Sequence, residues 1–212
     1  MHRGAAGPMS AGARAGPPPV GRLLYSAICS LDGYVADREG GFAWAEPDEE
    51  VLAATVELDG PVGTHLYGRR TYELMAAWEG EEPETWSEQS AAFARSWRAL
   101  DKVVYSTSLQ RVGTPRTRLE RRFDPDAVRE LVRASPADVS VGGPTLGAAA
   151  LRAGLVDELH LFLVPALVGG GLAALPDGVR LDLRLLEARR FAGGTVLLRY
   201  AVEGAQAPVS MS

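Results

Sequence analysis

The sequence predicts a single α/β domain with a mostly parallel central sheet, flanking helices and an antiparallel C-terminal edge. Short apolar, β-compatible runs alternate with segments of helical periodicity along the body of the chain, and the chain then ends in a series of strands. The composition, 46% hydrophobic and 23% charged over 212 residues, is typical of a globular protein of this size. No linker or internal repeat divides the body, so we expect one domain over residues 22–203.

Both ends of the chain differ from this body. Residues 1–21 are almost entirely Gly, Ala, Pro, Ser and Arg, and residues 204–212 are similar in character. Such segments cannot bury enough apolar surface to offset the entropy lost on ordering. We therefore expect a disordered N-terminal tail and a flexible C-terminal tail.

The predicted elements follow from hydrophobic periodicity and from start and stop signals. A helix over 49–58 begins after Pro47 and Asp48, and a helix over 126–134 begins after Asp124 and Pro125. The remaining helices are predicted over 71–78, 87–100 and 145–153. Strands are predicted over 22–30, 34–36, 64–67, 102–105, 138–141, 158–164, 181–188 and 195–202.

Composition also excludes several classes of function. Lys+Arg 22 against Asp+Glu 27 gives a net charge of -5, which disfavours a general binder of nucleic acid or of anionic membranes. The single cysteine, Cys29, excludes an internal disulfide, and the three widely spaced histidines predict no metal site. No apolar run reaches the roughly 18 residues of a membrane helix. We expect a cytoplasmic protein.

Two predicted strand ends carry residues suited to binding phosphate. In open α/β sheets, ligands lie beyond the carboxyl ends of parallel strands, where helix N-termini supply free N–H groups. The first strand end is followed by Gly68, Arg69, Arg70 and Thr71, which alternatively form only a glycine turn with solvated arginines. The second is followed by Ser106 and Thr107, whose hydroxyls bind a ribose phosphate or simply terminate the strand through local bonds.

A third strand end has paired glycines. It is followed by Gly142, Gly143, Pro144, Thr145 and Leu146, in which the glycines allow close approach of a ligand and the proline suits a first helical turn. Its alternative is a tight strand–helix turn. Together, the three strand ends predict a nucleotide lying across one edge of the sheet.

The chain resembles the dihydrofolate-reductase-like superfamily, and within it the reductase domain of the bifunctional riboflavin-biosynthesis deaminase–reductases, as a stand-alone bacterial member. The resemblance covers about residues 22–202, and no HxE or PCxxC motif of a deaminase half is present. The motifs that carry it are SLDGYVA (30–36), LYGRRTYE (66–73), VVYSTSL (103–109), VGGPTL (141–146) and GLVDELHLFLVPALVGGG (154–171).

This resemblance implies a three-layer fold and NADPH as cofactor. Gly68, Arg69 and Thr71 match the family's GRxT segment, in which the arginine meets the 2′-phosphate and the threonine the pyrophosphate. Ser106 and Thr107 match hydroxyls beside the 2′-phosphate, and residues 142–146 match the turn under the pyrophosphate. The backbone of Ala27 and Ile28 matches the segment that faces the nicotinamide carboxamide.

The substrate side rests on fewer residues. Trp44 to Glu49 resembles the W-x-x-P-x-acid stretch of dihydrofolate reductases, which makes Glu49 the candidate acid, with Asp48 as the neighbouring alternative and an acidic helix start as the structural explanation. Trp44 would line the ring pocket. Asp32 follows the first strand and is the second candidate acid, although an Asp-Gly turn explains it equally well.

These motifs predict an NADPH-dependent reductase of a small planar, pterin- or pyrimidine-like substrate. One alternative is the 5-amino-6-(5-phosphoribosylamino)uracil reductase of riboflavin biosynthesis, but Met75 stands where that family has a substrate-binding acid. Another is a non-catalytic NADPH-binding sensor or partner protein. The resemblance also suggests a homodimer, through the C-terminal strands around 158–164.

Overall fold

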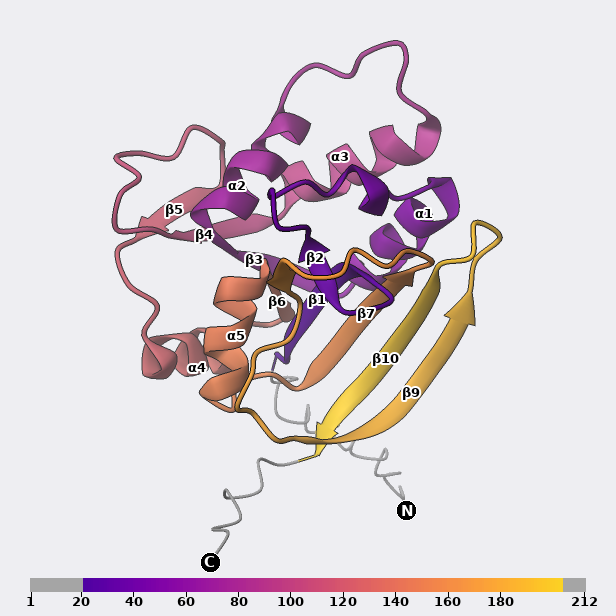
Figure 1. Cartoon of the computed structure of the whole chain (residues 1–212). Coiled ribbons are helices and arrows are strands. Elements are labelled where there is room, and N and C mark those ends of the chain that lie inside the picture. Colours follow the sequence, from indigo (N-terminus) through magenta and orange to yellow (C-terminus); the bar gives the residue numbers. More distant parts are fainter. Residues whose placement is uncertain (1–20, 204–212) are drawn as a thin grey trace, which may run out of the picture.

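A computed structural model describes residues 21–203, and the two predicted tails lie outside the described residues apart from Gly21. Its centre is an eight-stranded sheet of order β5-β4-β3-β6-β1-β7-β10-β9 (Figure 1). Six of these strands are parallel, and β10 and β9 continue the sheet in the antiparallel direction. The predicted α/β class with an antiparallel C-terminal edge is confirmed.

The elements lie close to their predicted positions. The strands of the large sheet are β1 (Leu23–Ser30), β3 (Val62–Gly68), β4 (Asp101–Tyr105), β5 (Thr117–Glu120), β6 (Asp138–Gly142), β7 (Glu158–Val164), β9 (Asp182–Arg190) and β10 (Val196–Glu203). A small second sheet pairs β2 (Tyr34–Ala36) with β8 (Leu172–Ala173). The helices are α1 (Glu49–Asp59), α2 (Arg69–Met75), α3 (Glu88–Ala99), α4 (Pro125–Ala134) and α5 (Pro144–Arg152), with 3-10 turns η1 (Ala43–Ala45) and η2 (Ala76–Glu79).

Helices cover both faces of the sheet, which makes three layers (Figure 1). On one face, α4 and α5 pack on a core that includes Leu23, Leu66 and Val141. On the other face, α1 packs on β7 and β10 around Phe162, while α2 and α3 pack on β3 and β4. Each helix buries one apolar stripe against the alternating side chains of the strands.

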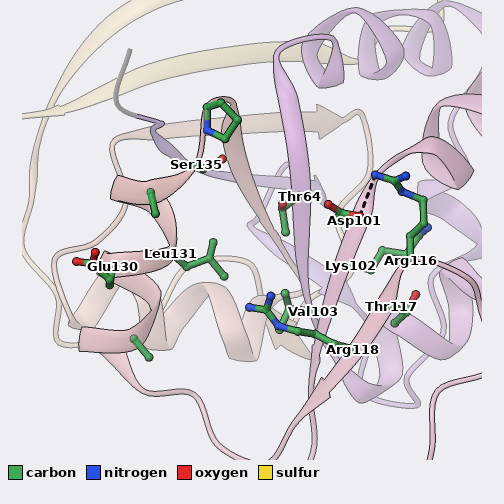
Figure 2. Close-up of a pocket in the computed structure, with 13 residues that line it drawn as sticks. Thr64, Asp101, Lys102, Val103, Arg116, Thr117, Arg118, Glu130, Leu131 and Ser135 are labelled. Atoms are coloured by element: carbon green, nitrogen blue, oxygen red, sulfur yellow. Dashed lines mark ion pairs between the residues drawn. The ribbon is translucent and has the colours of Figure 1, made fainter. Parts of the chain in front are cut away.

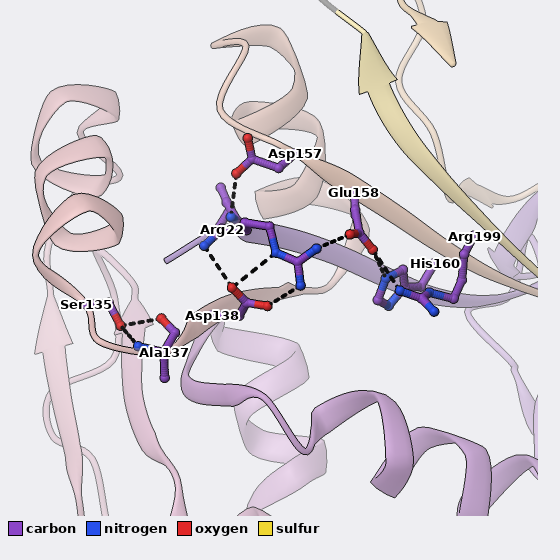
Figure 3. Close-up of polar contacts among 9 residues, drawn as sticks. Arg22, Ser135, Ala137, Asp138, Asp157, Glu158, His160 and Arg199 are labelled. Carbon is purple, nitrogen blue, oxygen red and sulfur yellow. Dashed lines mark hydrogen bonds and ion pairs between the residues drawn. The ribbon is translucent and has the colours of Figure 1, made fainter. Parts of the chain in front are cut away.

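A network of charged groups joins the amino ends of the central strands (Figure 3). Arg22 donates to Asp138 at the start of β6, at 2.5 Å, and to Glu158 at the start of β7. Glu158 also bonds His160 and Arg199, both at 3.1 Å. His160 is therefore a hydrogen-bonded core histidine.

The buried His65 and the partly buried Asp59 lie between α1 and β3. His65 Nε2 lies 3.6 Å from Asp59 Oδ2 at the end of α1. Burial raises the pKa of Asp59 to about 7 and lowers the pKa of His65 to about 4, because each charged form loses its hydration. Around neutral pH, His65 is therefore neutral, while Asp59 is close to half ionised.

Lys102, the single lysine of the chain, is buried in β4. Its ammonium group lies 4.2 Å from the ring centroid of Trp97 and donates to the carbonyl oxygen of Leu100 at 3.0 Å. The cation is thus held by an aromatic face and a backbone carbonyl in place of water.

β7 has no free edge. It is hydrogen-bonded to β1 on one side and to β10 on the other. Among the C-terminal strands, the free edge of the sheet belongs to β9, where Leu183, Leu185 and Leu186 are exposed. The predicted dimer contact around residues 158–164 therefore has no unpaired edge of β7 with which a second copy could pair.

Candidate functional site

The three predicted phosphate-binding strand ends lie together at one edge of the sheet. β3 is parallel to β4 and to β6, so Gly68 lies beside Tyr105, and Tyr67 lies beside Gly142. The helices that follow β3 and β6 begin at this edge with Arg69 and Pro144. Their first N–H groups and the positive ends of their dipoles therefore converge on one region.

Gly142 and Gly143 form a tight cradle against β3 and α2. Gly143 has φ +93°, and a Cβ atom there would lie 2.3 Å from Thr71 Oγ1. A Cβ on Gly142 would lie 2.7 Å from the ring of Tyr67. Both positions thus exclude any side chain, which leaves the backbone of this turn accessible at its open side.

The residues after the cradle take different places. Pro144 occupies the first turn of α5, and Thr145 is exposed. Leu146 is a core residue, so only its backbone is available at this edge. The sequence prediction grouped these three residues with the cradle, and their role as cofactor contacts stays a prediction.

Arg69 connects the first strand end to the second. Its Nη1 donates to Ser108 Oγ at 3.1 Å and its Nε donates to Glu73 Oε1 at 2.7 Å. The guanidinium is half exposed. Arg70 is exposed and has no side-chain hydrogen bond within the described part of the chain.

The hydroxyl groups that follow β4 differ in burial and in their hydrogen-bond partners. Ser106 is buried, and its Oγ accepts from the N–H groups of Ser108 and Leu109 at 3.3 and 3.0 Å, so it closes the strand end locally. Thr107 is exposed. Ser108, which was not among the predicted site residues, is the one that meets Arg69; its place in the hydroxyl run was the available signal.

β1 is an interior strand, yet its middle is not fully covered. Ser26, Ala27 and Ile28 are all partly exposed between two paired neighbours. Ile28 packs on the α1 side, and strand alternation puts Ser26 on that same face. Ala27 packs toward the α4–α5 side. The helices thus leave the middle of β1 partly exposed on both faces, beside Gly142, whereas Cys29 and Ser30 at its carboxyl end are buried.

The two acids at the start of α1 differ in their contacts. Asp48 caps the helix by accepting from the N–H of Val51 at 2.9 Å, and its carboxylate also abuts Gly193. Glu49 is exposed and makes no side-chain hydrogen bond among the described residues. Of these two candidate acids, Glu49 is therefore the one whose carboxylate has no partner within residues 21–203.

Trp44 lies in η1, which contacts β1. Its indole Nε1–H is buried without a hydrogen-bond partner among the described residues. A buried donor of this kind is costly unless it is satisfied by a ligand or water. Met75 is the last residue of α2 and packs against the cluster of Tyr67, Tyr72 and Trp97.

Asp32 lies just beyond β1, and its carboxylate accepts hydrogen bonds from the backbone of the loop after β7. Hydrogen bonds from Ser30, Gly169 and Val168 lower its pKa below the ordinary value. An acid with a lowered pKa is ionised at neutral pH, which does not suit it to donate a proton.

A separate groove of about 820 Å³ lies at the opposite, amino edge of the sheet (Figure 2). It runs between α4 and the starts of β3, β4 and β5, with Leu131 and Val103 in its lining and the Arg116–Asp101 ion pair at its rim. It contains none of the predicted site residues. Within residues 21–203, no group of His, Cys, Asp and Glu side chains could hold a metal ion, and no helix is long and apolar enough to cross a membrane.

Comparison with known proteins agrees with this architecture. The sequence model of the RibD C-terminal domain matches residues 22–197. The chain belongs to the RibD C-terminal domain family. This confirms the family resemblance expected from the motifs.

Individual relatives are distant in sequence. The uncharacterized protein YyaP of Bacillus subtilis (strain 168) is 24% identical over 190 residues, covering 86% of this chain and 96% of its own. A provisionally assigned riboflavin biosynthesis protein from Shewanella sp. PV-4 superposes with a TM-score of 0.68 at 18% identity, covering 86% of this chain and 99% of that one.

A third relative is the deaminase/5-amino-6-(5-phosphoribosylamino)uracil reductase of Thermotoga maritima. It superposes with a TM-score of 0.58 at 14% identity, covering 86% of this RibD C-terminal domain chain and 56% of the Thermotoga chain. The structural likenesses establish the dihydrofolate-reductase-like fold.

Proposed function

We propose that this RibD C-terminal domain protein is an NADPH-dependent reductase that delivers a hydride to a small planar, pterin- or pyrimidine-like substrate. Family membership supports an oxidoreductase of the pyrimidine-reductase kind. The observation that carries the cofactor assignment is the cradle formed by Gly143 and Thr71 at the sheet edge, next to the Arg69–Ser108 pair.

These residues fit a dinucleotide phosphate. The glycine turn would present the backbone N–H groups at the start of α5 to a pyrophosphate, and Thr71, which packs against Gly143, would add its hydroxyl. Arg69 and Ser108 offer a guanidinium and a hydroxyl for the 2′-phosphate that distinguishes NADPH from NADH. When bound, NADPH would supply the hydride.

The open middle of β1 is our candidate for the reacting end of the site. The backbone of Ala27 and Ile28 would orient the nicotinamide. Trp44 Nε1–H, which has no hydrogen-bond partner within residues 21–203, would donate to a ring substrate. Glu49 would hold or relay the proton, since its carboxylate accepts no hydrogen bond from the described residues, whereas the carboxylates of Asp48 and Asp32 accept backbone N–H groups. Met75 offers no acid for the substrate, so we place the phosphoribosylaminouracil reaction second.

The first test is a paired titration of the full chain with NADPH and NADH, in which binding is measured by the quenching of tryptophan fluorescence. We expect NADPH to bind at least ten-fold more tightly than NADH. Arg69→Ala should remove most of that difference, whereas Arg152→Ala, an exposed arginine at the end of α5, should not. Binding of neither nucleotide would refute the cofactor assignment.

Activity is then measured as NADPH oxidation with 7,8-dihydrofolate and with 5-amino-6-(5-phosphoribosylamino)uracil. Turnover of the second compound alone would favour the riboflavin-pathway reductase. Tight NADPH binding without oxidation by any planar acceptor would favour a sensor or partner protein.

We further propose that the protein is a cytoplasmic homodimer. Support for the dimer is the exposed leucine pattern on β9, the free edge of the sheet. An apolar edge strand is normally covered by another chain or element.

A further inference from the structure

The loop that follows β7 is fastened to the end of β1 and to the small second sheet. Leu31 donates its N–H to the carbonyl oxygen of Ala166 at 2.8 Å. Beyond the loop, Tyr25 Oη donates to the carbonyl oxygen of Ala174 at 2.6 Å. The segment 165–174 therefore lies across the carboxyl ends of β1 and β7, next to the open middle of β1.

Asp32 holds this loop with both oxygens of its carboxylate. Oδ1 accepts from the N–H of Val168 at 3.2 Å and Oδ2 accepts from the N–H of Gly169 at 2.8 Å. The hydroxyl of Ser30, which itself accepts from Tyr34 N–H at 3.0 Å, also hydrogen-bonds Asp32. A carboxylate used in this way satisfies backbone donors that the loop cannot satisfy itself.

Arg38 holds the same loop from the other side. Its Nη2 donates to the carbonyl oxygen of Gly169 at 3.0 Å. A Cβ atom on Gly170 would lie 2.7 Å from Arg38 Nε, which shows that the guanidinium lies directly against the loop backbone. The backbone of Gly169 is thus hydrogen-bonded on both sides, through its N–H to Asp32 and through its C=O to Arg38.

The glycines make this contact possible. Gly171 has φ +137°, and a Cβ atom there would lie 2.1 Å from the carbonyl oxygen of Ala36. No side chain fits between the loop and β2 at this point. The close fit of backbone on backbone fixes the loop in one position.

We propose that Asp32 and Arg38 are positioning residues that hold the Val168–Gly171 loop as a fixed wall at the nicotinamide end of the site. The inference rests on the proposed reductase function, and it assigns Asp32 a role other than proton transfer. The wall gives the space above β1 one shape, so that the nicotinamide and the acceptor meet in a single geometry.

The test combines amide hydrogen exchange with NADPH titration on Asp32→Ala, Asp32→Asn, Arg38→Ala and Gly171→Ala. We expect exchange over residues 166–174 to rise at least ten-fold in Asp32→Ala, Arg38→Ala and Gly171→Ala, while thermal unfolding stays close to that of the parent chain. The NADPH dissociation constant should rise at least five-fold in the same variants. Asp32→Asn keeps one acceptor oxygen, so its hydrogen exchange over residues 166–174 and its NADPH affinity should both be close to those of the parent chain.

Glu39→Ala is the matched control, because Glu39 is an exposed acid in the same segment whose carboxylate has no hydrogen-bond partner within residues 21–203. Unchanged exchange in Asp32→Ala and Arg38→Ala would overturn the proposal. The proposal would also be overturned if Asp32→Asn bound NADPH as weakly as Asp32→Ala while Gly171→Ala bound it as tightly as the parent chain. A parent chain that binds no NADPH would refute the cofactor assignment, while the exchange results would still decide whether Asp32 and Arg38 hold the loop.

Discussion

Gly143 and Thr71, which belong to two different strand–helix turns, approach so closely that a Cβ atom on Gly143 would lie 2.3 Å from Thr71 Oγ1. The contact joins the end of β6 to the start of α2. It also fixes Thr71 over the turn whose backbone N–H groups we assign to the pyrophosphate. The two strand ends therefore lie together in one candidate site.

Gly143→Ala should abolish NADPH binding. The added methyl must displace Thr71 or the turn, and it adds the strain of a positive φ, on the order of 1 kcal/mol. Gly154→Ala is the matched control, since Gly154 also has a positive φ, +62°, but an added Cβ there meets nothing within 4 Å. Fluorescence titration should show at least a fifty-fold loss for Gly143→Ala and parent-like affinity for Gly154→Ala; equal affinities would contradict the cradle.

Glu49→Gln and Asp48→Ala should separate chemistry from stability. Glu49→Gln should lower the rate of NADPH oxidation about a hundred-fold without weakening NADPH binding, as expected for loss of a general acid. Asp48→Ala should leave the rate intact but cost about 1 kcal/mol in urea unfolding, because it removes the helix cap. The reverse pattern would make Asp48 the acid.

Asp59 and His65, at the contact between α1 and β3, should give opposite pH dependences of stability. The raised pKa of Asp59, about 7, means that the folded protein keeps a proton that the unfolded chain releases near its ordinary value of 3.8, so this group makes stability fall between pH 4 and 7. The lowered pKa of His65, about 4 against 6.5, makes stability rise between pH 4 and 6.5. In the parent chain these two contributions to the pH dependence of stability oppose each other.

Single variants should show the pH dependence of stability that each group contributes. In urea unfolding, Asp59→Asn should become more stable from pH 4 to 6.5, and His65→Gln should become less stable from pH 4 to 7, each by on the order of 1 kcal/mol per pH unit. A parallel pH dependence in both variants would mean that these groups titrate normally.

Leu185→Lys tests the dimer. Leu185 is 52% exposed on the free edge strand β9. Light scattering should give a dimer mass for the parent chain and a monomer mass for Leu185→Lys, because a charge on an edge strand opposes pairing. Leu175→Lys, at a similarly exposed leucine outside β9, should remain dimeric. A parent chain that is monomeric at micromolar concentration would refute the dimer.

Hydrophobic periodicity predicted most elements of this fold, but it missed those with weak apolar signals. β5 is a four-residue edge strand of sequence TRLE with Leu119 as its one apolar residue, and β8 has two exposed residues, so neither has an apolar pattern long enough to mark it. The predicted helix over 71–78 ends at Met75 and continues as the 3-10 turn η2. Periodicity alone does not distinguish these two helix types.

The site was predicted as three strand ends, because glycines, hydroxyls and arginines after strands are visible in the sequence. Which hydroxyl meets Arg69 was not predictable, since Ser106 and Ser108 differ only in whether their Oγ atoms turn toward the local backbone. The engagement of Asp32 with a loop 136 residues away is likewise a property of the assembled fold.

The burial of Lys102 beneath Trp97 leaves the folded body of this protein without an accessible lysine amine. All other positive side chains are guanidinium groups, which keep their charge at any pH at which the protein is folded. Amine-directed acylating reagents and crosslinkers should thus react with the lysine only when β4 opens, so the rate of acylation at Lys102 measures opening of the sheet itself.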